Sequence, residues 1–255
     1  MRLLILPILL FIHIAELEVQ PQVMNEPTPE SIFSKAIQSI GGRRALEKID
    51  SFQLHGVMRL ADERPVIEID LSTSKGGKVL GIMTYIGLGQ SRFGSNGTIA
   101  WEQIFKATQE YEWSIIDQSV LSQKVRQINW LEWFTMLPAK LKNIEFDGEE
   151  EFGNEKCWKL IIQEDDGREQ HAFFSQSTFR PKGRTTIEKT PNGDATIHVY
   201  FKDWQRVGDL LLFHTVVYDR DGSLVTLKLN KISIEPILDS FFDLPPEVKL
   251  LIKEQ

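Results

Sequence analysis

The stretch DQSVLSQKVRQINWLEWFTML, residues 117–137, has helical periodicity in a chain whose other segments mostly alternate as strands do. It places Trp130, Trp133 and Phe134 within about one and a half helical turns, more aromatic surface than a connector between strands needs. Because a helix buries its apolar side against another element, we expect an apolar surface to lie against these residues. The nature of that surface distinguishes a packed β domain from a hydrophobic container with a helical lid.

Most of the remaining chain is organised as strands joined by tight turns. The candidate strands are residues 52–60, 66–72, 78–88, 98–105, 143–152, 156–163, 169–175, 184–189, 195–201, 211–218 and 224–234. Asn-Gly or Asp-Gly pairs at 96–97, 166–167, 192–193 and 221–222 favour hairpins, since these residues tolerate positive φ. The pair at 147–148 can instead mark a bulge within its strand. Strands joined so tightly must be antiparallel.

A second helix precedes the strands. Thr28 is a typical N-cap, Pro29 suits the first helical position, and Glu30 places an acid in the first turn. Apolar residues recur at helical spacing from Ile32 to Ile40, and two glycines then provide a stop signal.

These patterns predict a mainly β (α+β) fold. The strand at 78–88 is apolar on both faces, so this part of the sheet should be covered on both sides. A flat sheet of so many consecutive hairpins would leave long exposed edges unless it curled. We therefore expect one large, curved antiparallel sheet of about ten or eleven strands. It should form an incomplete barrel capped by the N-terminal helix and by an inserted lid helix.

The first residues resemble a secretory signal. Arg2 supplies a positive start, and the apolar run at 3–14 is too short to span a bilayer. Cleavage between residues 15 and 22 would leave a single soluble domain over residues 28–248, exported or periplasmic; an uncleaved anchor is the alternative. The one cysteine, Cys157, lies within a strand pattern, which predicts no lipidation cysteine, no disulfide and no Cys-based metal site.

Composition and motifs argue against nucleic-acid binding and against common catalytic sites. The net charge is −7 and no long cluster of Lys or Arg occurs, which argues against nucleic acid as a partner. The sequence contains no Gly-x-Ser-x-Gly elbow, no His-Glu-x-x-His pair and no glycine-rich phosphate loop. We therefore predict that the protein is not an enzyme and needs no cofactor or metal.

Four segments, in order, resemble a known family. They are residues 36–56, which run from a helix through Gly-Gly into a strand, the hairpin SNGTIAW at 95–101, DWQRVG at 203–208, and the closing stretch at 230–245. Together they resemble the secreted proteins grouped with the outer-membrane lipoprotein carrier LolA and its receptor LolB. The chain departs from the carrier in its greater length, with additional hairpins between residues 143 and 201.

The resemblance implies an incomplete barrel whose apolar concave face holds acyl chains under a helical lid. Candidate cavity residues are Met83, Tyr85, Phe93 and Trp101, and candidate lid residues are Trp130, Trp133, Phe134 and Met136. Each of these side chains could equally belong to an ordinary packed core. The partners implied are the acyl chains of a lipid or lipoprotein and a membrane-anchored receptor or release complex, with the protein itself monomeric.

Two other functions are compatible with the same fold. A sensor would use the cavity to detect a lipid or a peptide and pass on a signal. An enzyme acting on a lipid or glycan would need at least two carboxylates that converge at the cavity mouth.

Overall fold

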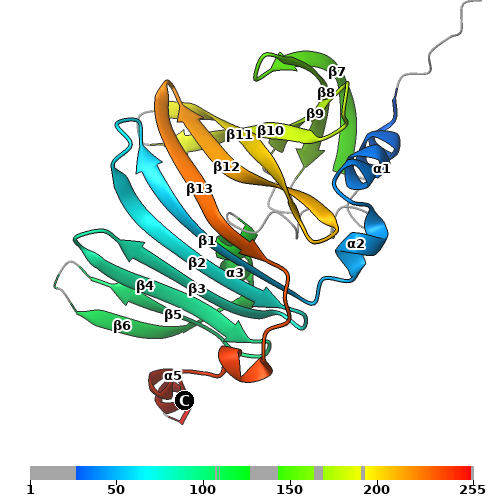
Figure 1. Ribbon diagram of the computed structural model, residues 1–255. Coiled ribbons are helices and arrows are strands. Elements are labelled where there is room, and N and C mark those ends of the chain that lie inside the picture. The colour runs from blue at the N-terminus through cyan, green and yellow to red at the C-terminus, as the bar shows by residue number, and fades with distance from the viewer. Residues whose placement is uncertain are drawn as a thin grey trace, which may run out of the picture.

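The chain folds around one thirteen-stranded antiparallel sheet, seen in the computed structural model (Figure 1). The structure describes residues 27–106, 108, 110–126, 143–163, 169–190 and 193–253. Its strands are β1 (Ser51–Leu60), β2 (Pro65–Ser74), β3 (Lys78–Tyr85), β4 (Gly89–Asn96), β5 (Ala100–Phe105), β6 (Tyr111–Ile116), β7 (Ile144–Phe152), β8 (Glu155–Gln163), β9 (Glu169–Ser175), β10 (Pro181–Thr190), β11 (Gly193–Val207), β12 (Leu210–Arg220) and β13 (Ser223–Ser233).

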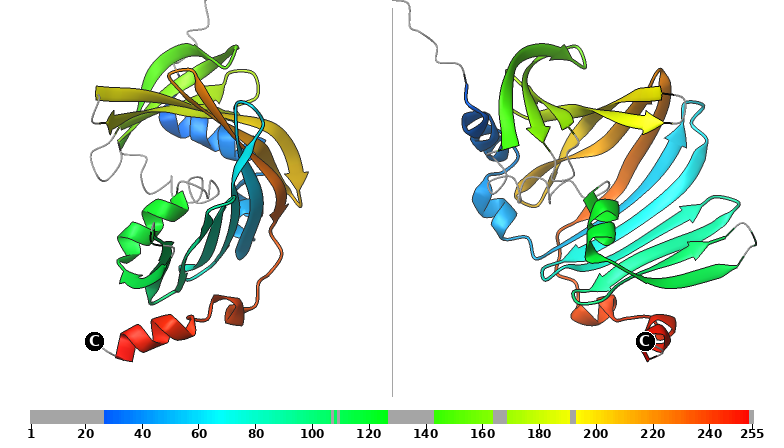
Figure 2. Two further views of the ribbon diagram at one scale, coloured as in Figure 1. Left: turned by 90° about the vertical axis from the view of Figure 1, so that its left-hand side faces the viewer. Right: turned by 180° about the vertical axis from the view of Figure 1, so that it is seen from behind.

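The strand order is β6-β5-β4-β3-β2-β1-β13-β12-β11-β10-β9-β8-β7. Every neighbour pair is consecutive in sequence except β1 and β13, which join the two halves of the sheet. The outer strands are β6 and β7, which follow one another along the chain. The sheet curls around its concave face, which carries α1 (Pro29–Ser39) toward one end and α3 (Gln118–Arg126) toward the other (Figure 2).

The fold class is confirmed, with two strands more than expected. The two additional strands are β4 and β6, and the predicted strand at 78–88 corresponds to β3 and the turn that follows it. The β4 sequence GQSRFGSN has no apolar alternation, so it carries no local strand signal. It forms because β3 and β5 pair with it on both sides.

Several turn predictions are also confirmed. Asp221 and Gly222 have φ of 50° and 86° and connect β12 to β13 as a two-residue hairpin. The register between β7 and β8 shifts after Phe146, and Gly148 has a φ of 82°, so the pair at 147–148 is a bulge. Residues 166–167 lie outside the described residues.

The N-terminal helix α1 begins as predicted, with the Ser31 N–H donating to Thr28 Oγ1 at 3.2 Å. Its buried side chains pack against the C-terminal half of the sheet, where the Phe33 ring meets Phe174 edge-on at 5.1 Å. Gly41 lies so close to the next element that an added Cβ would come within 2.5 Å of the Asp209 carbonyl oxygen. A short helix, α2 (Arg43–Glu47), then leads into β1.

Of the helix predicted at 117–137, the structure describes residues 117–126, where α3 forms. Leu121 and Val125 of α3 are buried in the main core, which confirms that this helix packs on the sheet. The predicted lid residues Trp130, Trp133, Phe134 and Met136 lie outside the described residues. At the C-terminus, the 3-10 helix η2 (Asp239–Phe242) and α5 (Pro246–Lys253) lie beside β3–β6 (Figure 1).

Candidate ligand-binding site

Two glycines, each covered by the aromatic ring of its cross-strand partner, show on which face of the sheet the predicted cavity residues lie. Gly81 pairs with Phe93, and an added Cβ at Gly81 would lie 2.2 Å from the Phe93 ring. Gly94 pairs with Trp101, whose ring would lie 2.8 Å from an added Cβ there. Because Phe93 and Gly94 are adjacent in one strand, their side-chain directions are opposite. Phe93 belongs to the main core together with Leu121 of α3, so it lies on the concave face and Trp101 lies on the convex face.

This register separates the four predicted cavity residues. Met83, Tyr85 and Phe93 lie on the concave face, and Met83 packs against the main core. Trp101 is buried on the opposite face, where its ring lies 5.4 Å from that of Trp113. The structure therefore does not place Trp101 with the other three. A role for these side chains in ligand contact stays a prediction.

A pocket of about 330 Å³ opens between α2, α3 and the ends of β1, β2 and β3. Its lining residues are Leu46, Ile49, Asp50, Ser51, Phe52, Thr73, Ser74, Lys75, Gly76, Gly77, Lys78, Val79, Gln118, Leu121, Ser122 and Val125. The apolar side chains among them include Phe52, Val79 and Leu121, which belong to the main core. The core is therefore continuous with an open space at this end of the concave face.

The β2–β3 turn forms one polar side of this pocket. Gly76 and Gly77 have φ of 79° and 73°, a conformation that glycine adopts without steric cost. The Lys75 N–H donates to the Asp50 carbonyl oxygen at 2.9 Å, and the Lys75 ammonium forms an ion pair with the Asp50 carboxylate. Lys78 pairs with Asp239 of η2 at 2.6 Å.

The opposite side of the pocket is formed by α3, which polar contacts hold to the sheet. Gln118 Nε2 donates to Ser95 Oγ and to the Thr98 carbonyl oxygen, both at 3.3 Å. Lys124 Nζ lies 2.9 Å from Glu102 Oε2, and the Glu102 side chain is mostly buried. These contacts and the buried Leu121 position α3 as one wall of the pocket.

Sequence reasoning named aromatic residues and missed this pocket. The signal that could have pointed to it is the segment SKGGK at 74–78, which combines a tight turn with two lysines. The pocket itself depends on α2 and α3, which are far apart in sequence, so no local pattern predicts it.

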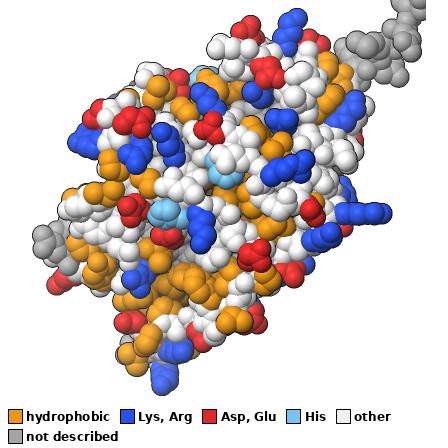
Figure 3. All heavy atoms as spheres, in the orientation of Figure 1, with side chains coloured by type: hydrophobic (Ala, Val, Ile, Leu, Met, Phe, Trp, Pro, Cys, Tyr) orange, Lys and Arg blue, Asp and Glu red, His pale blue; other side chains and the backbone are white. Residues whose placement is uncertain are grey.

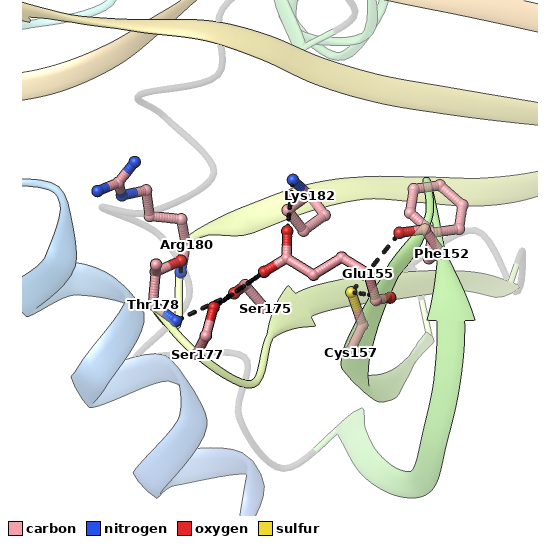
Figure 4. Close-up of polar contacts among 8 residues, drawn as sticks. All are labelled: Phe152, Glu155, Cys157, Ser175, Ser177, Thr178, Arg180 and Lys182. Atoms are coloured by element: carbon pink, nitrogen blue, oxygen red, sulfur yellow. Dashed lines mark hydrogen bonds and ion pairs between the residues drawn. The ribbon is translucent and has the colours of Figure 1, made fainter.

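A second polar cluster lies at the β9–β10 turn (Figure 4). Glu155 accepts from Ser175 and Ser177 and pairs with Lys182 at 2.8 Å. The hydrogen bond from Lys182, followed by that from Ser175, holds the pKa of Glu155 below its ordinary value. Ser175 has no exposed surface, so a substrate cannot reach it. The cluster therefore ties β8, β9 and β10 together.

Nearby Cys157 is buried, and burial raises the pKa of its thiol to about 11. It therefore stays protonated near neutral pH, which makes it a poor nucleophile. Among the residues that the structure describes, no group of three or more His, Cys, Asp or Glu is arranged to hold a metal ion. Within the same residues, no helix combines the length and apolar character needed to cross a membrane.

The outer surface differs from the pocket. Basic and acidic side chains are interspersed over the face seen in Figure 3, and hydrophobic side chains gather near the C-terminal segment at its lower end. The exposed apolar residues of that segment are Leu238, Phe241, Leu250 and Ile252. They form an outward-facing surface, whereas the pocket exposes apolar side chains that belong to the core.

The fold has known counterparts among solved structures. The structure of a LolA superfamily protein from Nitrosomonas europaea superposes with a TM-score of 0.53 over 85% of this chain and 98% of that one, at 16% identity. The chain has the LolA-type fold. A DUF1329 family protein from Desulfovibrio piger gives a TM-score of 0.53 over 84% of this chain and 96% of that one, at 9% identity.

At these identities the similarity concerns the fold alone, and it confirms the fold expected from the sequence resemblance. No protein-family model and no curated protein matches the sequence.

Proposed function

We propose that this protein is an exported carrier or chaperone that holds an acyl chain of a lipid or lipoprotein on the concave face of its LolA-type sheet. The observation that carries this proposal is the pocket between α2 and α3, where core side chains such as Phe52 and Leu121 line an open space. Apolar walls with a few polar groups at the rim are typical of small-molecule sites. The Nitrosomonas protein belongs to the LolA superfamily, and this similarity of fold supports the same function by analogy.

The energetics suit reversible transport. Each methylene transferred from water to an apolar site contributes about 0.8 kcal/mol, so about ten buried methylenes contribute about 8 kcal/mol before the cost of association. That gross value corresponds to roughly micromolar affinity at most. A carrier of this kind can both load and release its cargo.

The residues predicted from the sequence have two proposed roles, as part of the concave binding face and as the lid. Met83, Tyr85 and Phe93 share the concave face with the pocket, so a longer chain would extend along them. Trp130, Trp133, Phe134 and Met136 remain the proposed lid. The proposed partners are acyl chains and a membrane-anchored receptor or release complex, and the carrier acts as a monomer without catalysis or cofactor.

Substitution within α3 tests the proposal. Ser122→Trp places a large ring in the pocket lining and should weaken binding of a fluorescent fatty acyl probe by at least about tenfold, equivalent to about 1.4 kcal/mol. The matched control is Ser119→Trp, an exposed position of the same helix that does not line the pocket. It should bind the probe as the unmodified protein does.

The native ligand is sought by mass spectrometry of protein purified from its own cell envelope. We expect a co-purifying lipid in the unmodified protein and less of it in the Ser122→Trp variant. Absence of lipid together with failure to take up the probe would exclude the carrier function.

A further inference from the structure

The segment that follows β13 crosses the end of the sheet at which the pocket lies (Figure 1). The Ile237 N–H donates to Oγ of Ser51, a residue of the pocket lining, at 3.3 Å. Asp239 of η2 then pairs with Lys78 at the start of β3 at 2.6 Å. Alternation along β3 places Lys78 on the convex face, opposite Val79. The segment therefore lies on the convex side of the strand ends whose concave side bears the pocket.

Three large apolar side chains of this segment face outward from a fixed backbone. Leu238 lies between the two contacts just described, yet its side chain is 80% exposed. Phe241 of η2 is 46% exposed and Leu250 of α5 is 59% exposed, while the buried Phe242 and Val248 hold the two helices against the protein. Leu250 follows Val248 by two residues, about 200° around a helix, so it projects away from the packed side.

Resting on the carrier function proposed above, we propose that Leu238, Phe241 and Leu250, the C-terminal apolar surface, dock the protein on the interfacial region of a lipid bilayer. Apolar side chains displayed by an amphipathic segment at a membrane surface insert at the boundary between head groups and acyl chains. Docking through this surface brings the strand ends that border the pocket close to the bilayer. An acyl chain then has a short path between the membrane and the pocket.

The charge of the segment favours a bilayer as the partner. Residues 237–253 contain three acids and two lysines, and Lys78 pairs with one of the acids, so the segment and this lysine together have no net charge in a protein of net charge −7. A neutral surface approaches phospholipid head groups without the repulsion that an acidic surface meets at anionic lipids. Lys249 and Lys253 are exposed beside Leu250, where their stems can lie along the interface and their ammonium groups can reach lipid phosphates.

The composition of the segment argues against a protein partner. Residues 237–253 contain no Trp, Tyr or Arg, the residues in which the energetically dominant positions of protein interfaces are enriched. Leu238 is almost fully exposed and so projects from the surface. A projecting apolar side chain needs a matching hollow in a protein partner, whereas a fluid lipid layer accommodates it without one.

Sedimentation with protein-free phosphatidylcholine vesicles tests the inference. We expect the unmodified protein to bind these vesicles and the triple variant Leu238→Ser/Phe241→Ser/Leu250→Ser to bind at least about tenfold more weakly, because the apolar area transferred to lipid is lost. The matched control is Ile187→Ser on β10, since Ile187 is also 59% exposed but lies in the other half of the sheet. It should bind vesicles as the unmodified protein does. Raising the salt concentration should change binding by less than about twofold, because salt screens charges and not apolar contacts.

A second measurement shows that the triple variant is folded. Its affinity for a fluorescent acyl probe in vesicle-free solution should equal that of the unmodified protein, because none of the three substituted residues lines the pocket. Transfer of the probe from loaded protein to vesicles should nevertheless slow by at least about tenfold, in step with the loss of docking.

The outcomes separate docking from the carrier function. If the unmodified protein binds the probe in solution but not the vesicles, or if the triple variant binds vesicles equally well, docking is overturned and the carrier function stands. Binding to native envelope vesicles but not to protein-free vesicles assigns the surface to a protein partner and overturns the inference. A dimer that the triple variant loses assigns it to a second copy, with the same result. Vesicle binding without any uptake of the probe supports docking and removes the carrier function.

Discussion

The two halves of the sheet bury their concave faces in different ways. In the C-terminal half, α1 packs directly on the strands, with Phe33 against Phe174 and Gly41 against the backbone of Asp209. In the N-terminal half, α3 also buries apolar side chains, yet a pocket remains between it, α2 and the strands. The comparison shows that one curved sheet can supply a rigid wall at one end and a binding space at the other.

Matched leucine substitutions test this difference most strongly. Leu160 on β8 is fully buried in the C-terminal half, whereas Leu121 on α3 lines the pocket. Leu160→Ala should lower the free energy of unfolding by about 4–5 kcal/mol, near the upper end for such changes. Leu121→Ala should cost about 2–3 kcal/mol, because the cavity that the truncation leaves would join the pocket that Leu121 lines. Urea denaturation measures both, and equal losses would show that the two halves are packed alike.

A glycine substitution tests the direct contact of the chain after α1 with β12. Gly41→Ala should lower the free energy of unfolding by about 2–3 kcal/mol, because its φ of 127° disfavours a side chain and the added Cβ would meet a carbonyl oxygen. Gly222→Ala is the control, since its φ is 86° but an added Cβ would meet nothing within 4 Å. It should cost only about 1 kcal/mol, the conformational cost alone. A similar loss at both positions would mean that the contact with Asp209 can relax.

An acidic substitution among the proposed lid residues tests whether they contact the acyl chain. Trp133→Asp should weaken binding of a fluorescent acyl probe by more than about tenfold, equivalent to about 1.4 kcal/mol, because a carboxylate would have to lie against an acyl chain. Circular dichroism should retain the β signal. Loss of that signal would assign Trp133 to the core instead.

The polar cluster at the β9–β10 turn predicts a small, pH-dependent effect. The pKa of Glu155 is lowered in the folded protein, so its ionised form stabilises the fold above the ordinary carboxyl pKa. Glu155→Gln should cost on the order of 1 kcal/mol at neutral pH. The difference from the unmodified protein should vanish as the pH falls from the ordinary Glu pKa through the lowered one. Glu151→Gln, at an exposed position of β7, is the control and should change the free energy of unfolding at neutral pH by no more than about 0.5 kcal/mol.

Much of the fold follows from local sequence signals. Strand patterns and turn residues together located eleven of the strands, and the Asp221-Gly222 pair formed the expected hairpin. Thr28 capped the first helix as its chemistry requires. Each of these features depends on residues within a few positions of one another, so a linear pattern is sufficient to predict it. By contrast, β4 depends on pairing with β3 and β5.

The candidate site was less predictable than the fold. Phe93 and Trp101 are both aromatic residues in strand patterns, yet the register places them on opposite faces. The polar rim could be noticed in the segment at 74–78, but its relation to α3 could not, because the helix and the turn meet only after folding.

The sequence by itself determined the antiparallel meander, the N-terminal helix and the inserted helix, since period, capping and turn chemistry are local properties. Only the tertiary structure decided that β1 pairs with β13, that Trp101 leaves the concave face, and that a pocket remains between α2 and α3. Those outcomes depend on contacts between residues far apart in the chain. Such contacts fix both the register of the strands and the volume that packed side chains leave empty.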